Sequence, residues 1–143
     1  MIRPATLHDV DAIFIIALQE TSFYEGLHPD DEKIRDGITK AISTAKHFVW
    51  VSENGDGVSG VLIGLTSRNL WAQRFNCIVP LWTSKIIGDG RKLLLAFKTW
   101  VQPRRAIRIA GFVCDSDHID QRAFNLAERM GFTRCGGAYL FYN

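Results

Sequence analysis

The segment TSKIIGDGRKLL, residues 83–94, holds two glycines one residue apart, directly before a run with helical spacing. The first turn of a helix carries backbone N–H groups without partners, at the positive end of the helix dipole. Glycine permits a positive φ and lets an anion approach the backbone without meeting a Cβ atom. The segment therefore predicts either an ordinary turn or a phosphate-binding loop, in which Lys85, Arg91 and Lys92 would add positive charge.

Two common nucleotide-binding loops do not fit this segment. It lacks the further GxxG spacing and the acidic strand end of a dinucleotide fold, and it lacks the Gly-Lys-Ser/Thr of a P-loop.

Charge is unevenly distributed, although the net charge is only +2. Residues 20–36 hold six acids and two bases, whereas residues 83–108 hold seven bases and one acid, Asp89. This pattern fits either two solvated helix faces of opposite sign, or an anion-binding side and a cation-attracting side.

The bulk composition is that of an ordinary soluble domain. The chain has 143 residues, 47% hydrophobic and 22% charged, and we expect a single domain over residues 1–143. No apolar run approaches the roughly 18 residues that cross a membrane, and residues 1–9 do not resemble a secretory signal. Cys77, Cys114 and Cys135 are widely spaced, which favours buried free thiols in a reducing, cytoplasmic setting and no metal site.

Hydrophobic periodicity and turn residues predict a mixed α/β (α+β) domain. A short extended segment leads into a helix capped by Thr6 and Asp9, and Gly131 is expected to end the last helix. The order β-α-α-β-β-β-α-β-α-β-β describes a meander followed by a β-α-β crossover. The expected strands after the second helix (30–43) are 47–53, 58–67, 70–82, a buried strand at 106–114, and short strands at 132–135 and 138–142.

Three sets of residues resemble the GCN5-related N-acetyltransferase (GNAT) family, over nearly the full chain. Residues 2–6, followed by Asp9 and Ile13, resemble the opening strand and first helix of that family. Residues 79–81 and 85–90 resemble its acetyl-CoA segment, commonly Gln/Arg-x-x-Gly-x-Gly/Ala. Ala123, Leu126 and the Met-Gly-Phe at 130–132 resemble its last helix and Leu-Gly-Phe signature.

This resemblance implies a twisted mixed sheet of six to seven strands with four helices, the GNAT-like acyl-CoA N-acyltransferase fold. Coenzyme A would lie where the strand ending near Val79 splays from the strand at 106–114. The pantetheine arm would pair with the backbone of Cys77, Ile78 and Val79, and an N–H near Val79 would polarise the thioester carbonyl. The pyrophosphate would contact the loop, whose implied cofactor-binding residues are Lys85, Ile86, Ile87, Gly88, Asp89, Gly90, Arg91 and Lys92.

The chain departs from the family pattern at two places that bear on chemistry. Lys85 replaces the usual Gln/Arg, so it keeps a donor and loses the fork geometry. Ala127 stands where family members often carry a tyrosine as general acid, and it fits the apolar face of its helix. Tyr24 is the best-placed substitute, because the segment after the first helix borders the acceptor site. Candidate general bases are Glu20, Glu25, His28 and Glu53.

Two functions from different classes follow from these observations. The first is an acetyl-CoA-dependent N-acetyltransferase that acts on a primary amine by direct transfer in a ternary complex. The second is a non-catalytic binding or structural protein of the same fold, which Ala127 and the imperfect match of the loop favour. The ending Gly136-Gly137-Ala138-Tyr139 is similar to short chains carried by tailed bacteriophages, and this resemblance implies a phage virion component as one form of the second function. We expect acetyl-CoA and an amine acceptor as partners and consider a homodimer. We expect no membrane contact, and we give nucleic acid little weight because no aromatic platform interleaves with the bases.

Overall fold

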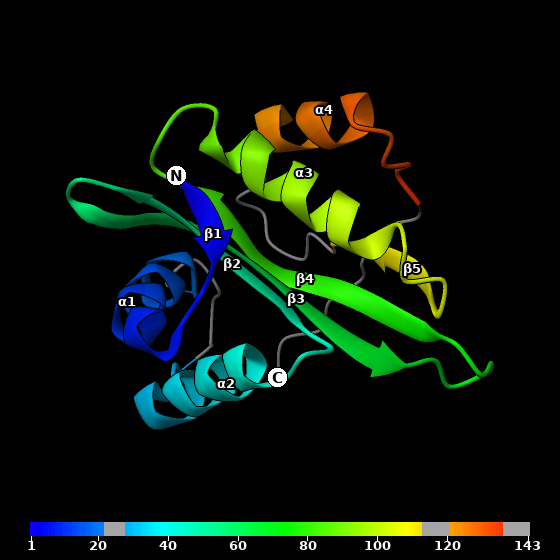
Figure 1. The fold of residues 1–143 in the computed structure, drawn as a ribbon, viewed down its shortest axis with the longest axis horizontal. Helices are drawn as coiled ribbons and strands as arrows, with labels where there is room; N and C mark the ends of the chain where they lie inside the picture. The colour runs from blue at the N-terminus through cyan, green and yellow to red at the C-terminus, as the bar shows by residue number, and fades with distance from the viewer. Residues whose placement is uncertain (22–27, 113–120, 136–143) are drawn as a thin grey trace.

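A computed structural model describes residues 1–21, 28–112 and 121–135 of the chain, which form one sheet with helices on both faces. In Figure 1, α1 and α2 lie against one face of the sheet and α3 and α4 against the other. The elements are β1 (Ile2–Pro4), a 3-10 turn (Leu7–Asp9), α1 (Val10–Thr21), α2 (Asp31–Ser43), β2 (Phe48–Asn54), β3 (Gly57–Arg68), β4 (Phe75–Ser84), α3 (Asp89–Val101), β5 (Ile107–Gly111) and α4 (Gln121–Arg129). No helix among these residues combines the length and apolar character needed to cross a bilayer.

The strands follow one another across the sheet in sequence order. Strands β1 to β4 pair antiparallel, and β5 pairs parallel to β4 after the α3 crossover. The meander and the β-α-β unit are therefore confirmed. The sheet has five strands in the described part of the chain, so the expectation of six to seven is wrong there. Residues 132–135 are not a strand, and the expected strand at 138–142 lies outside the described residues.

Each face of the sheet has its own apolar core. Successive strand residues point to opposite faces, so β2 and β3 contribute to both cores. The first core joins α1 and α2 to the sheet and includes Ile13, Phe14, Ile38, Val51 and Val61. The second joins α3 and α4 to the sheet and includes Phe48, Leu62, Leu93, Leu94, Phe97 and Ala127.

The ends of the elements have local causes in the sequence. Gly57 takes φ +105° in the β2–β3 turn, and Gly131 takes φ +90° after α4, as glycine allows. The Asp30 side chain caps α2 by accepting from the Lys33 amide (2.9 Å). At the start of the first helix Thr6 and Asp9 form the expected capping box, and the Thr6 amide and hydroxyl both donate to the Asp9 carboxylate.

Three expectations about strands and burial are wrong. The strand expected from residue 70 begins only at Phe75, because Asn69 closes a loop by donating its backbone amide to the Arg74 carbonyl (2.8 Å). The strand expected to be buried over 106–114 is shorter, and Ile109 is 57% exposed. Cys77 is buried, whereas Cys135 is exposed; Cys114 lies outside the described residues.

Candidate active site

Strands β4 and β5 pair over only part of their length. Their parallel ladder runs from Phe75 opposite Ile107 to Ile78 opposite Gly111, where β5 ends. Strand β4 continues to Ser84 and is paired on one side only, with β3. Among the described residues the other edge of β4 is therefore unpaired from Val79 to Ser84.

A β-bulge lies where β5 leaves β4. Ile63 is opposite Leu81 and Leu65 is opposite Ile78, so Val79 and Pro80 together face the single residue Gly64. Bulges of this kind bend a strand and are frequent beside functional sites, and Pro80 has no N–H to lose there. A Cβ atom on Gly64 would lie 2.8 Å from Cε2 of Phe97, so glycine is required for α3 to pack this closely.

The segment between β4 and α3 is an open loop with unused backbone donors. Gly88 precedes α3 with φ +89°, and a Cβ atom there would meet nothing within 4 Å, so its backbone angle rather than space demands glycine. The Asp89 amide donates to the Ile86 carbonyl (3.2 Å). Within the described residues four amides of this loop and the first turn of α3 have no acceptor, those of Ile87, Gly88, Gly90 and Arg91.

The carboxylate of Asp89 points inward, away from these four amides. It accepts from the hydroxyl of Ser52 in β2 and from Lys92 Nζ (2.8 Å), and Ser52 in turn contacts Ser59 (3.2 Å). Asp89, Ser52 and Ser59 are all buried. The Lys92 ammonium, then the Ser52 hydroxyl, holds the pKa of Asp89 below its usual range. The one acid of the segment is therefore neutralised and leaves the exposed amides facing solvent.

Two further contacts fix the position of this loop. The Trp82 indole N–H, from β4, donates to the Gly90 carbonyl (3.0 Å), and the Lys85 amide donates to the Ser59 carbonyl (2.9 Å). Of the basic residues, Lys92 is paired with Asp89, while Lys85 and Arg91 are exposed and have no carboxylate partner within the described residues. The result is a rigid turn with free N–H donors and positive charge, which suits a phosphate group.

The whole chain superimposes on solved acetyltransferase structures. A possible acetyltransferase from Clostridium difficile 630 matches with a TM-score of 0.71 at 16% identity, over 100% of this chain and 96% of that one. A predicted acetyltransferase from Clostridium acetobutylicum, solved with acetyl-CoA, matches at 0.72 and 12%, over 100% and 95%. The aminoglycoside acetyltransferase meta-AAC0020 from an uncultured soil metagenomic sample, in complex with sisomicin, matches at 0.67 and 19%, over 100% and 94%. The chain has the acetyltransferase fold. No family model matches the sequence, and no curated protein matches it either.

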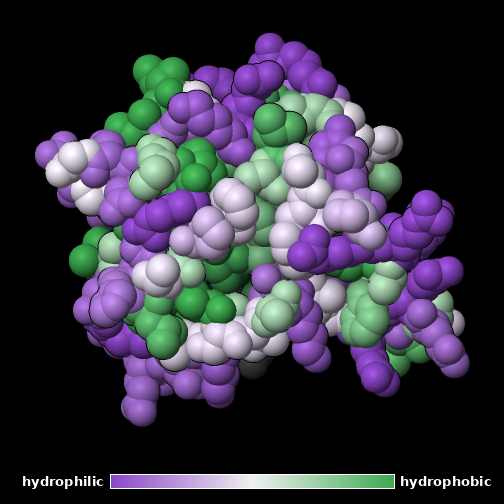
Figure 2. Space-filling view, viewed as in Figure 1, coloured by the Kyte–Doolittle hydropathy of each residue, from purple (hydrophilic) through white to green (hydrophobic). Residues whose placement is uncertain are grey.

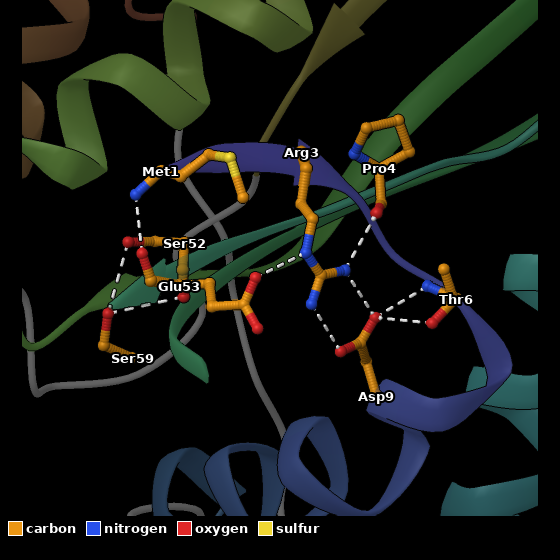
Figure 3. Close-up of polar contacts among 8 residues, drawn as sticks. All are labelled: Met1, Arg3, Pro4, Thr6, Asp9, Ser52, Glu53 and Ser59. Carbon is orange, nitrogen blue, oxygen red and sulfur yellow. Dashed lines mark hydrogen bonds and ion pairs between the residues drawn. The ribbon is translucent and has the colours of Figure 1, made fainter. Parts of the chain in front are cut away.

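Within this acetyltransferase fold, Glu53 is held in an ion pair (Figure 3). Arg3 Nε donates to Glu53 Oε2 (2.7 Å), and the same guanidinium makes two hydrogen bonds to Asp9 (2.8 and 2.9 Å). The Arg3 guanidinium lowers the pKa of Glu53, which makes that carboxylate a poor proton acceptor. The candidate base Glu53 is therefore better explained as a structural residue. Through Arg3 of β1 it links β2 to Asp9 in the 3-10 turn before α1.

The acceptor-side candidates are less well defined. Glu20 lies in the last turn of α1, on the face of the sheet opposite α3, and its carboxylate makes no hydrogen bond or ion pair within the described residues. His28 is exposed. Tyr24 and Glu25 lie outside the described residues, as do Tyr139 and Tyr142. No group of three or more metal-binding side chains occurs in the described part of the chain.

Ala127 is buried at 3% exposure in the core between α4 and the sheet. Its packing role is as expected, and it places no hydroxyl at this position.

The anchors of the loop were missed by sequence reasoning. Ser52, Ser59 and Trp82 were not singled out, although two serines at buried positions of a β-hairpin are a signal that a polar partner lies beneath them. The partner, Asp89, is distant in sequence and is identified only by the fold.

Proposed function

We propose that this protein is an acetyl-CoA-dependent N-acetyltransferase that acts on a primary amine. The observation that carries the proposal is one continuous path along the sheet: the edge of β4, unpaired from Val79, leads into a loop with four unused amides. The match in fold to acetyltransferase structures, one of them solved with acetyl-CoA, supports the same conclusion.

The chain's residues fit the two polar parts of coenzyme A. Pantetheine carries amide groups that pair with a strand edge, and the edge of β4 is unpaired from Val79 onward, whereas Cys77 and Ile78 lie inside the ladder with β5. The pyrophosphate would be bound by the amides of Ile87, Gly88, Gly90 and Arg91, with Lys85 and Arg91 supplying charge. Ile86 and Lys92 shape the turn, and Asp89 anchors it.

When bound, acetyl-CoA supplies the thioester whose acetyl group passes directly to the amine in a ternary complex. A backbone N–H at Val79 would donate to the thioester oxygen as charge develops there. The attacking amine must lose a proton, which Glu20 would accept through water, while Tyr24 would protonate the leaving thiolate. These two roles remain predictions, and the pair Glu20→Gln and Tyr24→Phe tests them.

We propose a cationic amine as the acceptor. Asp31 and Glu32 lie exposed in the first turn of α2 with no ion-pair partner among the described residues, and attract positive charge, whereas Asp36 is paired with Lys40 (2.6 Å). The experiment is thiol release from acetyl-CoA in the presence of an aminoglycoside, a polyamine, a lysine peptide and a free N-terminal peptide. Release with at least one amine supports transfer. Absence of release with every amine, although acetyl-CoA binds, supports the alternative below.

The alternative is a non-catalytic binding protein of the same fold. Burial of Ala127 favours it, because no general acid stands at the position where the family often has one. Under this alternative the loop binds coenzyme A and no thiol is released with any amine.

A further inference from the structure

The loop between β3 and β4 presents two large apolar side chains to solvent. Leu70 is 82% exposed and Trp71 is 88% exposed, whereas most apolar residues of the sheet are buried. Figure 1 shows this loop as the far end of the longest hairpin, and Figure 2 shows hydrophilic and hydrophobic residues intermixed at that end. Adjacent exposed apolar side chains of this size mark a contact surface more often than isolated ones do.

The exposure belongs to an ordered loop. The Asn69 side chain accepts from the Trp71 amide (2.8 Å), and the Asn69 amide donates to the Arg74 carbonyl (2.8 Å). Asn69 Nδ2 also donates to the Asn76 side chain across the hairpin (3.3 Å). The loop therefore holds Leu70 and Trp71 outward rather than letting them fold back on the sheet.

Arginines surround the tip. Arg68 and Arg74 flank it on the hairpin, and Arg74 Nη1 donates to the Arg105 carbonyl (3.3 Å), which brings the α3–β5 turn alongside. The Phe75 amide donates to the Ala106 carbonyl (2.8 Å) in the same place. Segments 68–76 and 98–112 contain no acid, and no described carboxylate pairs with the exposed arginines of this region, which are Arg68, Arg74, Arg104, Arg105 and Arg108.

We propose that this tip docks on an anionic lipid surface, with Leu70 and Trp71 entering the interface and the arginines contacting headgroups. Tryptophan and leucine partition into the boundary between headgroups and acyl chains, and basic residues beside them are attracted by anionic lipids. A nucleic acid fits less well, since Leu70 offers no π-face and a projecting tip forms no groove for a phosphate backbone. This peripheral contact reverses our expectation of no membrane contact, which rested on the lack of a spanning segment.

The test is co-sedimentation of the full chain with vesicles of phosphatidylcholine alone or mixed with phosphatidylglycerol. We expect the protein to bind the mixed vesicles and expect salt to weaken this binding. The double variant Arg68→Gln, Arg74→Gln should bind more weakly, by about fivefold for each charge removed. Leu70→Ser with Trp71→Ser should lower binding by about tenfold or more. The matched controls, Lys33→Gln with Arg129→Gln and Leu7→Ser with Leu95→Ser, change exposed residues elsewhere and should bind as the unchanged protein does.

A second readout locates the contact. Brominated lipid should quench the tryptophan fluorescence of the unchanged protein. The Trp71→Phe variant should still sediment with vesicles but should show no such quenching. No sedimentation with mixed vesicles overturns the proposal, as does equal binding by the Leu70→Ser, Trp71→Ser variant or quenching that survives Trp71→Phe. Neither readout involves acetyl transfer, so the result is independent of the proposed function.

Discussion

The Ser52 hydroxyl in β2 donates a hydrogen bond to the Asp89 carboxylate in the first turn of α3. Both residues are buried, and the contact joins the open loop before α3 to the middle of the sheet. Replacing Ser52 by alanine leaves Asp89 with one fewer donor. We therefore expect Ser52→Ala to lower the free energy of unfolding by about 1–3 kcal/mol, measured by urea denaturation.

The same change should weaken acetyl-CoA binding, because the loop loses part of its support. Ser67→Ala, at an exposed position of β3, is the matched control and should alter neither property. Equal stability and equal acetyl-CoA affinity in Ser52→Ala and Ser67→Ala would show that the hydrogen bond from Ser52 to Asp89 supports neither property.

Asp9 predicts a loss of stability in acid. Hydrogen bonds from the Arg3 guanidinium lower the pKa of Asp9 from 3.8 to about 2. Because the folded state holds this carboxyl at a lower pKa than the unfolded state, its contribution is present above about pH 4 and is lost as the pH falls through about 2. The contribution is on the order of 2 kcal/mol. Asp9→Asn should lower the free energy of unfolding at neutral pH and reduce the loss of stability in acid, measured by urea denaturation as a function of pH. Asp31→Asn, at an exposed position, should leave the loss of stability in acid unchanged.

His47 predicts a second pH effect at higher pH. Its Nδ1 accepts from the Thr66 amide (3.0 Å), and burial, followed by the nearby Lys46 charge, lowers its pKa. The folded state therefore favours the neutral ring. Its contribution to stability is full above the unfolded pKa of about 6.5 and falls as the pH drops below that value toward the folded pKa. Urea denaturation between about pH 7 and pH 5 should show this slope, and His47→Gln should remove it. A slope that persists in His47→Gln would assign it to another group.

Two glycines predict opposite effects of the same substitution. Gly64→Ala places a Cβ 2.8 Å from Phe97 and 3.1 Å from Cys77 Sγ beneath the bulge, and should cost about 1–3 kcal/mol. Gly37→Ala adds a methyl group with nothing within 4 Å inside α2, and should stabilise by about 0.5–1 kcal/mol. Thermal unfolding of the two variants checks both signs. A Gly64→Ala variant as stable as the unchanged protein would contradict the close approach of α3 to β3, and a destabilised Gly37→Ala variant would contradict the open space at Gly37.

Sequence periodicity predicted the helices and strands whose buried face can be recognised from the pattern of their own apolar residues. The helix after Gly88 has apolar residues at helical spacing, and the structure places Leu93, Leu94 and Phe97 in the core. The β2–β3 hairpin followed from its glycine-rich turn. Local patterns of this kind repeat every two or 3.6 residues, so a single sequence reveals them.

The sequence could not predict features that depend on contacts between distant segments. Leu70 and Trp71 have strand-forming side chains, but the loop that Asn69 closes places them in solvent. Ile109 has the residue type of a buried strand, but it lies in β5, which pairs only with β4 among the described residues. The inward direction of Asp89 likewise required Ser52 and Ser59, whose positions come from the folded sheet.

Calorimetric titration with acetyl-CoA tests most directly whether the turn at Gly88 binds the pyrophosphate. The unchanged protein should bind with a dissociation constant on the order of micromolar. Gly88→Ala forces a residue with a side chain to adopt φ +89°, and the left-handed conformation costs such a residue about 1–2 kcal/mol. We therefore expect Gly88→Ala to weaken acetyl-CoA binding by about tenfold. Gly57→Ala is the matched control, because it imposes a similar backbone strain (φ +105°) in the β2–β3 turn, outside this loop, and it should bind as the unchanged protein does. Absence of binding to the unchanged protein, or equal affinity in the two variants, would contradict binding of the pyrophosphate at this turn.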